Sequence, residues 1–569
     1  MRLQFALTLA VSLVFSMGTG NAEGNAGSYL AARTAIIENN FSEAAKHFTR
    51  ALVRDPRNVV LLENAMSAYL GLGDIERAVP LARRMSEVGA PSQISSMVML
   101  GDAARRGDWD RVIEDIDAGQ TVGPLFDGLA RAWAELGSGQ MSSATTGFDG
   151  VIASNGVEAF GMYHKALALA SVGDFESAAE IFSGDAGTTI RLTRRGVVAY
   201  AQVLSQLEKN EVALELIESS FGANLDPALD AMRTELSDGE TLVFDAVRAP
   251  ADGVAEIFHS IAGALRDEAQ GAYTLLYARM ALVLRPDHID ALLLTAEILE
   301  ELGRYELATE VYDTVPRSSP AYHSAELGRA EALRRSGRED AAIEVLRQLT
   351  ESHAEIPLVH VTLGDTLRGL ERFTEAIAPY DHALSLIDSP TDRHWIVFFA
   401  RGIAHERTDQ WEKAEADFRR ALELRPEQPQ VLNYLGYSFL EMQDNLDEAL
   451  DLIERAVALS PDSGYIIDSL GWGLYRIGRY NEAVGHMERA VELMPIDPVV
   501  NDHLGDVYWA VGRLREAEFQ WHRALSFVTE DTDTGDIDPD RIRRKLEIGL
   551  DDVLVEEGAA PLEMANDDG

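Results

Sequence analysis

The sequence predicts an all-α protein built as a solenoid of antiparallel helix pairs. Gly402 and Gly436 are 34 residues apart, and Gly471 and Gly505 are separated by the same 34 residues. Within each such unit, apolar residues recur at the i, i+3 and i+4 spacing of amphipathic helices. One helix pair cannot bury its own apolar face, so a chain of repeated pairs must stack them.

Each unit carries the same pattern of small and helix-ending residues. When the glycine is position 8, alanine recurs at positions 20 and 27, and proline recurs at position 32. The residues at position 20 are Ala414, Ala449, Ala483 and Ala517. Small residues at positions 8 and 20 let two helices approach closely, and the proline ends the second helix. In the most regular unit, this pattern predicts helices over 464–477 and 480–492, joined by a turn at Gly478.

The repeat pattern varies along the chain, and we count about 14 units. The pattern is regular from about Ala255 onward and decays between 93 and 254. The stretch 229–254 has no repeat register, so it is either an irregular insertion or a break between two halves of the solenoid.

The end of the chain predicts one more helix. Asp538 and Pro539 are a good N-cap and first helical residue for a capping helix over 540–554. The predicted domains are a signal peptide at 1–22, a degenerate N-terminal array at 23–228, the irregular segment at 229–254, a C-terminal array at 255–531, and an acidic linker, capping helix and flexible tail at 532–569.

The N-terminus resembles a secretion signal. An apolar run follows Arg2, and the small residues Gly20 and Ala22 predict cleavage before Glu23. The alternative is an uncleaved anchor. We expect export across the inner membrane, with the periplasm as the best-fitting location, and no integral membrane segment in the mature chain.

The chain contains no cysteine, which excludes disulfides, thiolate metal sites and a lipid-modified N-terminal cysteine. Any association with the outer membrane would therefore not use a lipobox cysteine.

The chain is strongly acidic. Its 50 basic and 94 acidic residues give a formal net charge of −44. This charge repels phosphate backbones and anionic membranes, so we expect no nucleic-acid partner. Basic protein partners are favoured electrostatically. The alternative is that the acidic surface serves only to keep the protein soluble.

No catalytic motif is present in the predicted mature chain. The sequence lacks an H-E-x-x-H zinc motif, a G-x-S-x-G elbow, a Walker A loop and a dinucleotide fingerprint. The aspartates after Glu530 superficially resemble a calcium loop, but Gly535 and Ile542 occupy positions where such a loop needs oxygen ligands. We therefore expect no enzymatic activity, no cofactor and no metal.

The repeat is similar to the tetratricopeptide repeat (TPR) family. The resemblance is clearest in SLGWGLYRIGRYNEAVGHMERAVELMP from Ser469, with its Leu-Gly pair, later alanines and final proline. Membership implies a right-handed superhelix whose concave groove binds extended peptides or partner helices. In that family, positions 2, 5, 9, 12 and 13 of the first helix line the groove.

Those positions predict an aromatic and acidic groove near the C-terminus. The predicted groove residues are Asn433, Tyr437, Asp468, Trp472, Tyr475, Asp502, Asp506 and Trp509. Such a surface suits a protein or peptide with basic or extended segments. The alternative is that Trp472 and Trp509 only pack against the next helix. Asp468 and Asp502 replace the lysine of the family's carboxylate clamp, so recognition of that type is not expected.

The whole plan resembles large proteobacterial envelope TPR proteins, which include outer-membrane lipoprotein adaptors of carboxy-terminal processing proteases. The resemblance implies a non-enzymatic scaffold or adaptor that recruits a protease or a cell-wall hydrolase. The missing lipobox cysteine is a departure from those adaptors. Two other readings stay open: a carbohydrate-binding or peptidoglycan-binding envelope protein, and a TPR-containing transferase.

Overall fold

The computed structural model describes residues 25–184, 192–222, 226–529, 537–559 and 562. Within these ranges the chain forms 31 α-helices and no strand, which confirms the all-α solenoid of helix pairs. The chain divides into two compact units, Met1–Leu349 and Thr350–Gly569. The predicted signal peptide at 1–22 lies outside the described residues.

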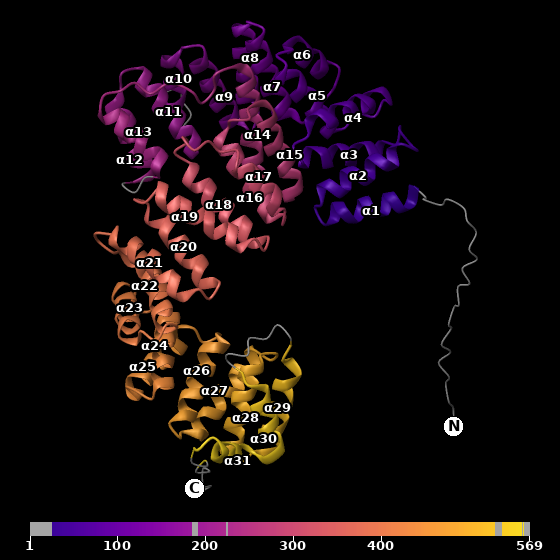
Figure 1. The fold of residues 1–569 in the computed structure, drawn as a ribbon. Coiled ribbons are helices and arrows are strands. Elements are labelled where there is room, and N and C mark those ends of the chain that lie inside the picture. The colour runs from indigo at the N-terminus through magenta and orange to yellow at the C-terminus, as the bar shows by residue number, and fades with distance from the viewer. Residues whose placement is uncertain (1–24, 185–191, 223–225, 530–536, 560–561, 563–569) are drawn as a thin grey trace, which may run out of the picture. The chain divides into compact units, whose positions relative to one another are not determined.

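The first unit contains the helices up to α19, whose last residues belong to the second unit (Figure 1). These helices are α1 (Asn25–Ile37), α2 (Phe41–Leu52), α3 (Val59–Gly71), α4 (Ile75–Glu87), α5 (Gln93–Arg105), α6 (Trp109–Asp117), α7 (Pro124–Gly137), α8 (Met141–Ile152), α9 (Glu158–Ser171), α10 (Phe175–Ser183), α11 (Arg194–Gln206), α12 (Asn210–Phe221), α13 (Pro227–Ser237), α14 (Pro250–Leu265), α15 (Gly271–Leu284), α16 (Ile289–Glu301), α17 (Tyr305–Tyr312), α18 (Tyr322–Arg335) and α19 (Glu339–Ser352).

The second unit continues with regular pairs and ends in two short helices. Its elements are α20 (Pro357–Gly369), α21 (Phe373–Ser385), the 3-10 turn η1 (Asp392–His394), α22 (Trp395–Glu406), α23 (Trp411–Leu424), α24 (Pro429–Met442), α25 (Leu446–Leu459), α26 (Gly464–Arg476), α27 (Tyr480–Leu493), α28 (Pro498–Ala510), α29 (Leu514–Phe527), α30 (Pro539–Ile548) and α31 (Leu550–Glu556).

The close approach predicted within each pair is present. In the α26–α27 pair, a Cβ added to Gly471 would lie 2.4 Å from the sulfur of Met487. A Cβ on Gly505 of α28 would lie 2.4 Å from the ring of Trp521 in α29. Each glycine therefore makes room for the bulky residue of the second helix. The turn glycine Gly478 has a φ of 83°, a conformation that side chains with a Cβ rarely adopt.

Helices α14 and α15 pack against helices far earlier in the chain. They contact α3, α5, α7 and α9, each the first helix of its pair, and Figure 1 shows α14 and α15 among these elements. The rings of Phe126 and Phe258 are 4.6 Å apart, and the Arg279 guanidinium donates to the Gly71 carbonyl over 3.2 Å. The first unit thus covers one side of its early helices with its own later helices.

The segment predicted as an insertion or a break lies inside the first unit. After α13, residues 238–249 form no helix, and polar side chains of earlier helices hold this stretch. Gln202 donates to Asp245 over 2.7 Å, and the backbone N–H of Leu242 donates to the Ser205 hydroxyl over 3.0 Å. The repeat register disappears where the chain turns back toward α7 and α9.

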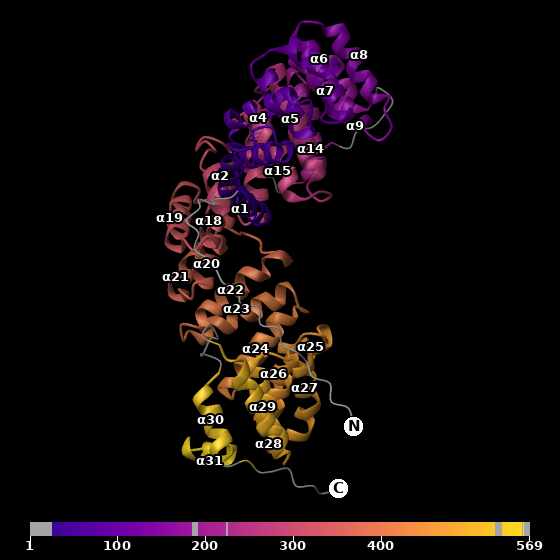
Figure 2. The same ribbon diagram turned by 90° about the vertical axis from the view of Figure 1, so that its right-hand side faces the viewer.

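The predicted last helix over 540–554 is wrong as a single helix. The structure has two, α30 and α31, separated at Gly549, whose φ is 85°. A Cβ on Gly549 would lie 2.7 Å from the Trp509 ring. Glycine therefore both permits the left-handed turn and leaves room for the indole. Figure 2 shows α30 and α31 as distinct segments at the C-terminal end.

Among the described residues, no helix is long and apolar enough to cross a membrane.

Candidate functional site

The predicted groove residues come from three first helices of the second unit. Asn433 and Tyr437 lie on α24, Asp468, Trp472 and Tyr475 on α26, and Asp502, Asp506 and Trp509 on α28. Asn433 is buried and its side-chain oxygen has no partner among the described residues, while Tyr437 is partly exposed.

Trp472 lies in a stack that joins α26 to α28. Its ring is 3.9 Å from the His503 ring, at an interplanar angle of 11°, and 4.8 Å from the Tyr475 ring. His503 Nδ1 lies 3.1 Å from an Asp468 oxygen. Burial opposes protonation of His503, but the charge and hydrogen bond of Asp468 outweigh it and raise the pKa. His503 was not among the predicted groove residues.

Asp502 and Asp506 hold a lysine from the C-terminal helix α30. Lys545 Nζ lies 2.9 Å from Asp502 and 2.6 Å from Asp506. The Lys545 side chain is 0% exposed. Trp521 Nε1 also donates to Asp506 over 2.9 Å. The acidic end of the predicted groove is thus filled by the chain's own basic residue.

Trp509 is covered by the same C-terminal segment. Its Nε1 donates to Asp551 of α31 over 3.0 Å, and its ring centroid is 5.4 Å from that of Trp521. Tyr437, Trp472 and Trp509 are each partly exposed. Tyr465, seven residues before Trp472 on α26, is 46% exposed.

The signal for this closure was present in the sequence. Four basic residues, Arg541, Arg543, Arg544 and Lys545, cluster in the tail. Arg541 and Lys545 are four residues apart, so these two lie on one helix face. Only the folded structure pairs that face with Asp502 and Asp506.

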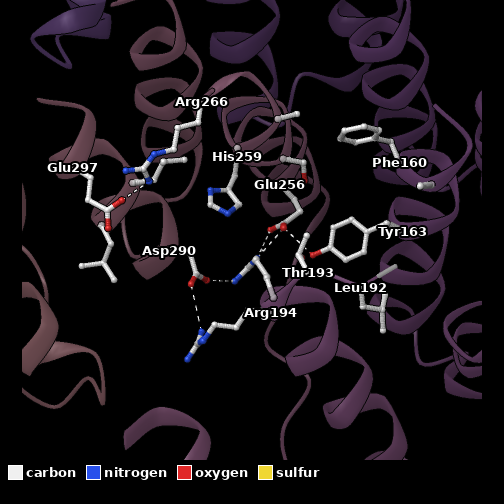
Figure 3. Close-up of a pocket in the computed structure, with 17 residues that line it drawn as sticks. Phe160, Tyr163, Leu192, Thr193, Arg194, Glu256, His259, Arg266, Asp290 and Glu297 are labelled. Carbon is white, nitrogen blue, oxygen red and sulfur yellow. Dashed lines mark hydrogen bonds and ion pairs between the residues drawn. The ribbon is translucent and has the colours of Figure 1, made fainter. Parts of the chain in front are cut away.

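The first unit contains a pocket that lies outside the predicted groove. Its volume is about 670 Å³, and it lies between α9, the start of α11, α14 and α16 (Figure 3). The lining residues are Ala159, Phe160, Tyr163, Leu192, Thr193, Arg194, Arg195, Glu256, His259, Ser260, Gly263, Ala264, Arg266, Asp290, Leu293, Leu294 and Glu297.

A buried ion network forms the polar wall of this pocket. Arg195 Nε lies 2.8 Å from both Glu256 oxygens, and its Nη1 lies 2.9 Å from Asp290. The Tyr163 hydroxyl donates to Glu256 over 2.9 Å, and His288 Nε2 lies 3.2 Å from it. Burial raises the pKa of Glu256, but Arg195 and His288 outweigh burial and hold it well below its usual range. Glu256 therefore stays ionised and fully paired.

Within the described residues, no group of three or more His, Cys, Asp or Glu side chains is placed to hold a metal ion.

The comparison with protein families decides the type of repeat. A model described as "Tetratricopeptide repeat" matches residues 265–323, 327–392 and 399–464. The chain carries tetratricopeptide repeats. TPR arrays imply a scaffold for protein–protein interaction, and scaffolds of this fold are generally non-catalytic.

Curated relatives match short parts of this chain. A TPR repeat-containing protein of Pseudomonas aeruginosa is 27% identical over 159 residues, 27% of this chain and 26% of that protein. Tetratricopeptide repeat-containing protein trd-1 of Caenorhabditis elegans is 30% identical over 24% of this chain and 16% of its own length. The aspartyl/asparaginyl beta-hydroxylase of Mus musculus is 26% identical over 25% of this chain and 20% of its own length. The matches therefore span about a quarter or less of each relative.

Solved structures are similar at low TM-scores. The APC/C hetero-tetramer Cut9–Hcn1 is 13% identical, with 92% of this chain and 96% of that chain covered and a TM-score of 0.37. The MamA protein is 19% identical, with 31% of this chain and 93% of that chain covered and a TM-score of 0.28.

Proposed function

We propose that this chain is an extracytoplasmic adaptor, a non-enzymatic TPR scaffold that holds protein partners in the periplasm or cell envelope. The TPR array is the observation that carries the proposal, because stacked helix pairs present long surfaces to partners. The signal-like N-terminus supports the location. The overall resemblance to envelope TPR adaptors supports recruitment of a protease or a cell-wall hydrolase.

The surface around Tyr437, Tyr465 and Trp472 is the proposed contact region of the second unit. Tyr465 is 46% exposed and Trp472 is partly exposed, and aromatic side chains supply contact area at small entropic cost. The formal charge of −44 favours a basic partner through electrostatic steering. We therefore propose that the partner presents a basic or extended segment to this surface.

Site-specific crosslinking in living cells tests the adaptor role. A photoreactive residue at Tyr437 or Tyr465 should capture a specific envelope protein. The same residue at Phe519 is the matched control, because Phe519 is 60% exposed on α29, a second helix of its pair. Capture of the same proteins from all three positions, or of none, would contradict a specific partner surface.

Fractionation and mass spectrometry test the location separately. The mature chain should begin at Glu23 and be released with periplasmic contents. An intact N-terminus in the cytosolic fraction would rule out the extracytoplasmic part of the proposal.

A further inference from the structure

The pocket of the first unit has the size of a small-molecule site. Its volume of about 670 Å³ lies within the range of roughly 300–1,000 Å³ that is typical of ligand pockets. Its four walls come from separate helices of one compact unit. The ion network of Glu256 and Arg195 is complete without a ligand, so it serves as a preformed wall.

Some polar groups that line this pocket can form further hydrogen bonds with a ligand. Arg194 Nη1 lies 3.8 Å from an Asp290 oxygen, which is beyond hydrogen-bonding distance, while its other nitrogens bind Asp226. One Asp290 oxygen accepts from Arg195, and the other accepts no hydrogen bond from a described residue. Figure 3 shows Asp290 between Arg194 and the His259 ring.

His259 adds a donor. Its Nδ1 is buried and has no partner among the described residues. An unpaired buried N–H is costlier than an unpaired lone pair, so we place the proton of the neutral ring on Nε2. Burial lowers the pKa of His259 to about 4, which keeps the ring neutral near pH 7. The pocket therefore offers donors at Arg194 and His259 and an acceptor at Asp290.

The lining of the pocket carries charges of both signs, and its other walls are apolar. The arginines 194, 195 and 266 face the carboxylates of Glu256, Asp290 and Glu297, while Arg194 and Arg266 also pair with Asp226 and Glu301 beside the pocket. Because both signs line the pocket, a zwitterion can find a partner for each of its charges. Phe160, Leu192 and Leu293 supply the apolar surface.

We propose that this pocket binds a small zwitterion with large apolar side chains, of the size of a free dipeptide or tripeptide. The ligand's carboxylate meets Arg194, its ammonium meets Asp290, and its side chains lie against the apolar wall. The cavity exceeds the needs of one amino acid, which favours the longer ligand. This site is separate from the partner surface of the second unit.

Fluorine NMR on the full mature chain tests the proposal with defined probes. The probe is the free dipeptide of leucine and 4-fluorophenylalanine, whose fluorine line should broaden on binding. The same dipeptide, N-acetylated and C-amidated, carries neither charge and should bind at least tenfold more weakly. Equal binding of the capped and free dipeptides would overturn the zwitterionic ligand, as would the absence of broadening by the free dipeptide.

A pocket-filling variant localises the binding. A Cβ on Gly263 meets nothing within 4 Å, so Gly263→Phe extends into the pocket from α14 without a backbone clash. It should abolish the broadening. Gly150→Phe is the matched control, because Gly150 is a helical glycine of α8 that also has open space and lines no part of this pocket. Unchanged binding by Gly263→Phe would place the ligand elsewhere. Loss of dipeptide binding in the Gly263→Phe variant should leave crosslinking at Tyr437 unchanged. Either proposal can therefore fail while the other stands.

Discussion

Lys545 shows how one residue defines the end of the array. Its ammonium group is wholly buried and lies between two aspartates of α28. A buried charge is tolerated only with close partners, since the loss of hydration is several kcal/mol for each ion. Lys545 thus ties α30 to the groove face of the last pair.

Replacing Lys545 by methionine should destabilise the second unit by about 3 kcal/mol, because the buried Asp506 would lose its ammonium partner and keep only the Trp521 hydrogen bond and Arg541 at 3.7 Å. Urea unfolding followed by tryptophan fluorescence measures this change. Lys46→Met is the control, since the Lys46–Glu43 pair is exposed to solvent and should contribute little to stability. Equal effects of the two variants would contradict a structural role for the buried pair.

His503 gives the second unit a defined pH dependence. Its pKa is raised in the folded state, so protonated His503 stabilises the fold below the unfolded pKa of about 6.5. That contribution is lost as pH rises through the folded-state pKa. The stability difference between the native chain and His503→Gln should therefore shrink as pH rises from about 6.5 through the raised folded-state pKa. Asp468→Asn should weaken this pH dependence, because Asp468 is the hydrogen-bonded carboxylate, while Asp502 and Asp506 also raise the pKa of His503. A constant difference across this range would refute the assignment.

At the scale of elements, α14 is the helix that decides the architecture of the first unit. It contacts α7 and α9 although α9 ends at Ser171 and α14 begins only at Pro250. Gly253 makes this approach possible, because a Cβ there would lie 2.3 Å from the Trp133 ring. The helix therefore needs glycine on one face and tolerates side chains on the other.

Two glycines of α14 should respond oppositely to alanine. Gly253→Ala should destabilise the first unit by roughly 1–3 kcal/mol, because the added methyl group overpacks against Trp133. Gly263→Ala should be neutral or stabilise it by up to about 1 kcal/mol, because its Cβ meets open space and alanine favours helix. Thermal unfolding of both variants measures the contrast. Similar effects would contradict the packing of α14 on α7.

At the scale of the whole molecule, the net charge of −44 acts on stability. Like charges repel more strongly in the compact state than in the unfolded chain. Raising the ionic strength from about 0.01 M to about 0.1 M shortens the screening length from about 30 Å to about 10 Å. The melting temperature should therefore rise with added sodium chloride. Potassium chloride should raise the melting temperature equally at the same ionic strength, because screening depends on ionic strength and not on the cation. A falling melting temperature would show that attractive ion pairs dominate.

The regular units were predictable because their signal is local. The α26–α27 pair begins and ends within two residues of the predicted bounds, since Gly471, Ala483 and Pro495 each act within one repeat. The degenerate region between 93 and 254 was harder to predict. Glycines such as Gly253 serve contacts across distant segments there, and the repeat period does not encode them.

The sequence by itself determined the all-α class, the repeat and its helix pairs, because amphipathic periodicity and close-packing residues are local properties. Only the tertiary structure decided what covers each surface. Lys545 fills the acidic end of the predicted groove, α14 and α15 cover the early helices, and Glu256 meets Arg195 beside a pocket. These contacts join residues tens to hundreds of positions apart, so their formation depends on how the chain returns on itself.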